Sequence, residues 1–285
     1  MNRTIFADNK NKVFKFMDKI TISKGKRPLI LVTNDDGIQA KGLKCLAEYI
    51  MPFGDVVVVA PNSPRSGQSA AITAGSPLRL SAIADQPGYK AFETNGTPTD
   101  CVKIAMNVLL RNHRPDLLVS GINHGSNSGV SVIYSGTMGA VFEGIMQGIP
   151  SIGFSLCDYA PDADFSICEQ LVSLLCRQAL ALGMPDNIGL NVNIPVVEKL
   201  NGVRVCRAAR GMWTEEYDSR IDPHGRPYYW LTGRFLNAEP DCPETDEYHL
   251  AHGYASIVPV TPDRTAININ HPFITMLGGE HPSVQ

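Results

Sequence analysis

The stretch that decides the fold is Leu29-Ile30-Leu31-Val32-Thr33-Asn34-Asp35-Asp36-Gly37-Ile38. Its unbroken apolar run is typical of a strand buried on both faces, as in a parallel sheet. The polar residues that follow would lie beyond the carboxyl end of that strand, where open α/β sheets bind their ligands. Asp35 and Asp36 are therefore candidate ligands of a hard cation. The sequence Asn-Asp-Asp-Gly is also good turn chemistry, so this stretch alone leaves a ligand site and a simple loop equally open.

Strands and helices alternate along the chain up to about residue 202. Further central strands are expected at 55–60, 116–120, 151–154 and 190–194, with shorter strands near 71–73, 78–81 and 90–93. Helices are expected at 40–50, from Thr97 onward, at 135–147 and at 165–182. The alternation predicts an α/β fold with a Rossmann-like, mostly parallel sheet flanked by helices.

The pattern changes after residue 202. Both tryptophans of the chain, Trp213 and Trp230, fall with several tyrosines around a polar turn, Asp222-Pro223-His224-Gly225. This arrangement predicts an extended β-hairpin arm at about 212–235. An exposed aromatic hairpin usually has a partner surface, so we expect an oligomer; a hairpin folded back over its own core is the alternative. The predicted division of the chain is a mobile N-terminal lead-in (1–28), a Rossmann-like catalytic core (29–202) and a smaller C-terminal part (203–285) that carries the arm.

Composition restricts the classes of function. The 285 residues carry a net charge of −3, which argues against a nucleic-acid groove, and no apolar run is long enough to suggest a membrane span. Seven cysteines, odd in number and without a Cys-x-x-Cys pair, favour reduced thiols in a cytoplasmic protein. The polar lead-in does not resemble a signal peptide, and either Met1 or Met17 could be the start.

Several familiar catalytic motifs are missing from the sequence. The first strand is followed by neither a dinucleotide fingerprint nor a complete P-loop, and there is no Gly-x-Ser-x-Gly elbow or His-Glu-x-x-His. Three successive strand ends instead deliver oxygen-bearing side chains: Asp35 and Asp36, then Ser66, then Asn123. Two carboxylates, a hydroxyl and an amide carbonyl suit Mg²⁺, Mn²⁺ or Ca²⁺ better than zinc. So few protein ligands would leave positions open for water and substrate.

A phosphate site is expected beside these ligands. Ser135, Gly136 and Thr137 open a helix whose N-terminal amides favour an anion, and Asn127 in the preceding glycine-rich loop could add a donor. Simple helix capping is the alternative for Ser135 and Thr137.

With these residues in place, the chain resembles the survival protein SurE family of 5'/3'-nucleotidases. The resemblance runs from about Leu29 to about Asn270 and rests on the following segments: 30–38 (ILVTNDDGI), 59–61 with 65–67 (VAP, RSG), 94–103 (TNGTPTDCVK), 120–123 (SGIN) with Gly125 and Asn127, 134–137 (YSGT), 190–195 (LNVNIP), and 245–246 with 253–254, Ser256 and Pro259. The lead-in before Leu29 departs from the family pattern.

The resemblance implies one divalent cation per subunit, most often Mg²⁺ or Mn²⁺, held by residues matching Asp35, Asp36, Ser66 and Asn123. It also implies hydrolysis of nucleoside 5'- and 3'-monophosphates, with short-chain polyphosphate as a further substrate. A homodimer or homotetramer joined through the hairpin arm is implied as well. Neither nucleic acid nor membrane is an expected partner.

The mechanism expected from these residues places the cation on a phosphate oxygen and on the attacking water. Asp36, with Asp35 beside it, is the candidate for orienting or deprotonating that water. A covalent phospho-enzyme is the mechanistic rival. The rival function is a non-catalytic, metal-dependent phospholigand sensor that uses the same loops only to bind.

Overall fold

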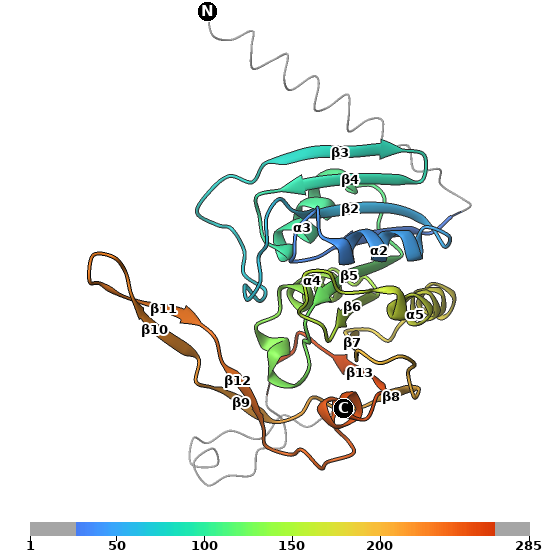
Figure 1. Ribbon diagram of the computed structural model, residues 1–285. Coiled ribbons are helices and arrows are strands. Elements are labelled where there is room, and N and C mark those ends of the chain that lie inside the picture. The colour runs from blue at the N-terminus through green and yellow to red at the C-terminus, as the bar shows by residue number, and fades with distance from the viewer. Residues whose placement is uncertain (1–26, 266–285) are drawn as a thin grey trace, which may run out of the picture.

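The computed structural model describes residues 27–265. The predicted lead-in lies almost wholly outside them, as does the question of Met1 or Met17. Nine strands form one sheet in the order β3-β4-β2-β1-β5-β6-β7-β13-β8 (Figure 1). The strands of this sheet are β1 (Leu29–Thr33), β2 (Asp55–Pro61), β3 (Leu80–Gln86), β4 (Tyr89–Thr94), β5 (Leu117–His124), β6 (Ser151–Leu156), β7 (Gly189–Ile194), β8 (Val203–Val205) and β13 (Ala255–Val260). The helices are α2 (Lys41–Ile50), α3 (Pro98–Ile104), α4 (Gly136–Met146), α5 (Glu169–Leu182) and α6 (Asp246–Ala251), with single turns η1 (Ala105–Leu109), η2 (Gly129–Ile133) and η3 (Ser166–Cys168).

The sheet is mostly parallel, which confirms the predicted fold class. All neighbouring pairs from β4 to β7 run parallel, while β3 and β13 pair antiparallel with β4 and β7. Two of the nine strands, β8 and β13, come from residues after 202, so the sheet joins the expected core to the expected C-terminal part.

The first strand is apolar on every residue because the sheet is covered on both faces. Ile30 and Val32 pack into a core with the buried residues of α2 and α5. Leu29 and Leu31 point the other way, into a core with residues of α3 and with Ala140 of α4. Successive side chains of a strand point to opposite faces, so a central strand without alternation needs helices on both sides.

The two helices that reach the carboxyl edge of the sheet begin as predicted. Thr97 and Asp100 form a capping box at the start of α3, in which each side chain accepts a hydrogen bond from the other's backbone N–H. Ser135 caps α4 by accepting a hydrogen bond from the backbone N–H of Met138 at 3.1 Å. The capping alternative for Ser135 is therefore confirmed.

Two local predictions were wrong. Residues 71–73 form no strand, and the edge strand β3 begins only at Leu80. The glycine-rich stretch after Ser120 is not a loop from its start, since β5 continues to His124. The strand can continue because it forms a bulge against β6 between Ser120 and Asn123. The bulge requires a glycine at position 121. Gly121 has a φ of +126°, and a Cβ on it would lie 2.3 Å from the Phe154 carbonyl oxygen.

The predicted hairpin arm is present. Its base pairs β9 (Gly211–Thr214) with β12 (Arg234–Asn237), and its tip pairs β10 (Tyr217–Ile221) with β11 (Pro227–Leu231). The arm projects away from the sheet (Figure 1), and every residue of β11 is exposed. The alternative of a hairpin folded back over its own core is thus wrong for the tip.

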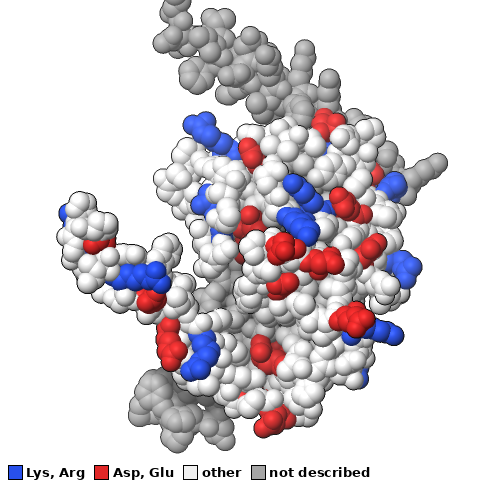
Figure 2. All heavy atoms as spheres, viewed as in Figure 1, with Lys and Arg blue, Asp and Glu red and all other residues white. Residues whose placement is uncertain are grey.

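The rest of the surface is unexceptional on the face shown in Figure 2. Acidic and basic side chains are interspersed there and do not gather into one basic patch. Within residues 27–265, no helix has the length and apolar character needed to cross a bilayer. All seven cysteines are free thiols.

Candidate active site

The predicted ligands arrive from adjacent strands at one edge of the sheet. Strand β1 lies between β2 and β5, so the residues that follow β1 and β2 and those that end β5 meet there. The backbone N–H of Arg65 donates to the Asp35 carbonyl at 2.7 Å, and the N–H of His124 donates to Oδ2 of Asp36 at 3.2 Å. These bonds hold the Ser66 loop and the end of β5 against the two acids.

Asp35 is buried against the start of α4. Its Oδ1 accepts a hydrogen bond from the Thr137 hydroxyl at 2.5 Å. Gly136 permits this approach, because a Cβ there would lie 2.8 Å from the Cβ of Asp35. Burial raises the pKa of Asp35 to about 6; the Thr137 hydrogen bond opposes this rise and the charge of Asp36 adds to it.

Asp36 is more accessible than its neighbour. Burial raises its pKa, and the backbone N–H and nearby ring of His124 oppose the rise. Within residues 27–265 its second oxygen, Oδ1, accepts no hydrogen bond, so one oxygen is held in place while the other is available to a ligand.

Asn123 and Ser66 complete the predicted metal ligands. The Asn123 amide nitrogen donates to the carbonyls of His124 (3.2 Å) and Gly125 (2.8 Å), which leaves its oxygen without a partner in the described part of the chain. The Ser66 hydroxyl is exposed. The donor chemistry fits a hard divalent cation, with two carboxylates and two neutral oxygens. Among the described residues no group of three or more His, Cys, Asp or Glu side chains is arranged to hold a metal ion, as a zinc site would require.

The predicted phosphate-binding residues lie beside these ligands, and their side chains have structural partners. Ser135 caps α4, and the Thr137 hydroxyl is directed to Asp35. Asn127 is buried: its side-chain nitrogen donates to Ser155 Oγ at 2.8 Å, and its backbone N–H donates to Asn193 Oδ1 at 2.8 Å. Phosphate binding by these residues stays a prediction.

Comparison with known proteins identifies the family. Residues 30–215 match the family described as Survival protein SurE. The chain belongs to this family. A relative from Cytophaga hutchinsonii, named 5'-nucleotidase SurE, is 50% identical over 242 residues that cover 84% of this chain and 93% of the relative. A protein of the same name from Bacteroides fragilis is 46% identical over 243 residues, with 85% and 95% covered.

A solved structure supports the same assignment. The crystal structure of the SurE protein from Aquifex aeolicus is 33% identical, with a TM-score of 0.72, and the match covers 88% of this chain and 98% of that one. The SurE resemblance expected from the sequence motifs is therefore confirmed.

Two asparagines of the SurE-like segment 190–195 have a role that the sequence did not assign. Asn191 and Asn193 are buried in β7 and support Asn127 from below, since the Asn191 amide donates to the Asn127 carbonyl at 2.8 Å. The signal was available in the sequence. Polar residues two apart in a strand share one face, and a buried strand carries them only where they have partners.

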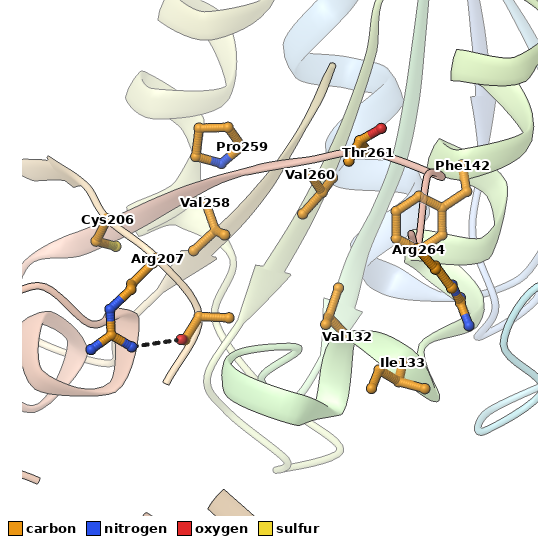
Figure 3. A pocket seen from close by; sticks show the side chains of 11 residues that line it. Val132, Ile133, Phe142, Cys206, Arg207, Val258, Pro259, Val260, Thr261 and Arg264 are labelled. Atoms are coloured by element: carbon orange, nitrogen blue, oxygen red, sulfur yellow. Dashed lines mark hydrogen bonds between the residues drawn. The ribbon is translucent and has the colours of Figure 1, made fainter. Parts of the chain in front are cut away.

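None of the predicted ligands lines a separate cavity of about 680 Å³ (Figure 3). Val132 and Ile133 of η2 line one side and Arg207 lies on the other, and Ala208 is a further lining residue (Figure 3). Phe142 and Arg264 lie next to each other in the lining (Figure 3). In this SurE-family chain, the cavity and the candidate active site are therefore different places.

Proposed function

We propose that this chain is a 5'-nucleotidase that hydrolyses nucleoside 5'-monophosphates to nucleoside and phosphate with Mg²⁺ or Mn²⁺ bound. The carrying observation is the meeting of Asp35, Asp36 and Asn123 with the start of α4 at one sheet edge. The names of the SurE relatives support the same activity.

A divalent cation held by Asp35, Asp36, Ser66 and Asn123 would supply charge neutralisation on the phosphoryl oxygens and lower the pKa of a water. Asp36 is the residue we assign to orienting the attacking water, because it is the less buried acid and His124 fixes one of its oxygens. Asp35 is assigned to holding the cation in a fixed position, since its carboxylate is buried and bonded to Thr137. The water oxygen bonds to phosphorus and the bond between phosphorus and the 5'-oxygen breaks. The 5'-oxygen of the departing nucleoside takes up the proton that the water loses.

The start of α4 is assigned to the phosphate. The N-terminal amides of a helix and its dipole favour an anion. Gly136 brings this helix end next to Asp35, so an anion bound there would lie beside the cation site. Hydrolysis of 3'-monophosphates and of short polyphosphate belongs to this proposal as a broader substrate range.

The arm is assigned to self-association into a homodimer or homotetramer. Cross-strand pairing in β10–β11 places Tyr217 with Leu231, Ser219 with Tyr229 and Ile221 with Pro227. Alternate pairs share a face, so these six residues form one largely apolar face, on which Tyr217, Ile221, Tyr229 and Leu231 are each more than 60% exposed. A surface of this kind on a projecting element favours a second copy of the chain as its partner. A cytoplasmic location stays a prediction.

The decisive test is phosphate release from AMP, GMP and other nucleoside monophosphates with Mg²⁺, Mn²⁺ or Co²⁺. Asp36→Asn should abolish the metal-stimulated release, whereas near wild-type turnover would overturn the assignment of Asp36. Binding of nucleotide without any release would favour the sensor. Solvent ¹⁸O entering phosphate in a single step, with no labelled phosphoprotein, would exclude the phospho-enzyme.

A further inference from the structure

A buried acid that is not among the predicted ligands joins two parts of the molecule. Asp246, the first residue of α6, is 0% exposed. Its Oδ2 accepts the backbone N–H of Gly129 at 2.8 Å, and its Oδ1 accepts the N–H of Ala209 at 2.8 Å. One carboxylate therefore holds two segments that are distant in sequence.

The first of these segments is the loop that leaves the candidate active site. Gly129 ends the stretch that begins with the metal ligand Asn123 and contains Asn127. Glu247, the next residue of α6, accepts a hydrogen bond from the Ser128 hydroxyl, which in turn contacts the hydroxyl of Ser126. The loop is thus fixed to α6 by side-chain contacts as well as by Asp246.

The second segment is the root of the arm, which we define as residues 207–210. The backbone N–H of Asp246 donates to the Arg207 carbonyl at 2.9 Å, so the root is bonded to this residue in both directions. The Arg207 guanidinium pairs with Glu239, and the Arg210 N–H donates to the same Glu239 carboxylate at 2.9 Å. Both strands at the base of the arm are therefore fixed to the root.

Packing between the two segments is incomplete. Phe235 of β12 lies over Gly129, 3.1 Å from the position of a Cβ there. Further along η2, however, the cavity of Figure 3 separates Val132 and Ile133 from Arg207. The Asp246 carboxylate spans the junction where the loop and the root do meet, and a buried carboxylate that accepts three backbone N–H groups is costly to replace.

From this connection we infer that Asp246 is a positioning residue, which sets the active-site loop 123–129 relative to the root of the arm and thereby tunes nucleotide binding. The inference rests on the proposed function for its substrate, while its structural part can be tested without activity.

The test compares Asp246→Asn with Asp241→Asn, a matched change at an exposed acid nearby. An amide has only one oxygen, so Asp246→Asn must release either Gly129 or Ala209. We expect the KM for AMP to rise by about tenfold, the usual effect of losing a supporting hydrogen bond around a site, with kcat less affected. Hydrogen–deuterium exchange in this variant should quicken at the segment that is released, 125–129 or 207–214, and at neither segment in Asp241→Asn.

Glu247→Gln provides a second, milder variant, because this side chain is only partly buried and contacts the loop but not the root. It should quicken exchange at 125–129 alone. If neither variant changes exchange at the loop or the KM, the inference is overturned. If the wild type releases no phosphate from any nucleotide, the proposed function fails, and the exchange pattern still decides the role of Asp246.

Discussion

The Thr137 hydroxyl donates to Oδ1 of Asp35 at 2.5 Å, across 102 residues of sequence. This bond joins the start of α4 to the end of β1, where the sheet presents its first acid. Thr137 therefore supports the proposed cation site through Asp35. Thr137, which the sequence pattern assigns to phosphate binding, therefore supports the Asp35 carboxylate.

Removing this support should weaken the metal site without unfolding the protein. Thr137→Val keeps the branched shape and deletes the donor, so Asp35 loses a bond that stabilises its ionised form. The apparent affinity for Mn²⁺, measured by calorimetric titration, should fall by about tenfold to a hundredfold. Thr137→Ser restores the hydroxyl and should recover most of the affinity. Equal losses in both variants would point to packing and not to the hydrogen bond.

The raised pKa of Asp35 predicts how the metal-free protein responds to pH. Its pKa is about 6 in the folded chain against an ordinary value of 3.8, so ionisation is disfavoured by folding. The protonated carboxyl contributes to the free energy of unfolding. This contribution is fully present below pH 3.8 and is lost as the pH rises through about 6. Asp35→Asn should therefore be more stable than the wild type in EDTA at pH 7.5, by up to about 3 kcal/mol. Urea titrations at pH 7.5 and at pH 4 measure this difference, which should nearly vanish at pH 4. A constant difference at both pH values would contradict the assignment.

The central part of the fold could be predicted because its causes are local. An apolar run, a helix of amphipathic spacing and a capping box such as Thr97 with Asp100 each fix one element without knowledge of the rest. The meeting of Asp35, Asp36 and Asn123 at one place followed from the rule that strand ends of a parallel sheet share one edge; their role as metal ligands stays a prediction.

The connections around the ligands could not be predicted in this way. The bond from Thr137 to Asp35 and those from Asp246 to Gly129 and Ala209 join residues that no periodicity relates. The extension of β5 to His124 was missed for a different reason. A glycine in a sequence usually marks a loop, and only the neighbouring strand shows that Gly121 forms a bulge.

The arm offers a test of self-association that leaves the candidate site untouched. Ile221→Glu combined with Leu231→Glu places two charges on the apolar face of β10–β11, where they would be buried by a partner. The molar mass by light scattering should fall to that of a monomer. Asp218→Asn with Arg220→Gln, on the opposite face, should leave it unchanged. An unaltered mass in the glutamate variant would show that the subunits meet elsewhere.

Tyr159 is the residue we expect to distinguish nucleotides from other phosphate esters. It follows β6 at the same edge of the sheet as the ligands, and its ring is 72% exposed. The ring covers Gly125, where a Cβ would come 2.2 Å from Cε1, so the ring lies against the loop two residues after Asn123. An aromatic face beside a phosphate site suits stacking with a nucleobase, which typically contributes about 1–3 kcal/mol per base.

Tyr159→Ala should raise the KM for AMP by about tenfold or more and leave that for ribose 5-phosphate unchanged, since the sugar phosphate has no base to stack. Tyr159→Phe keeps the ring and should behave like the wild type. An equal rise for both substrates would mean instead that Tyr159 supports the loop through Gly125, because a displaced loop would weaken phosphate binding whatever the leaving group carried.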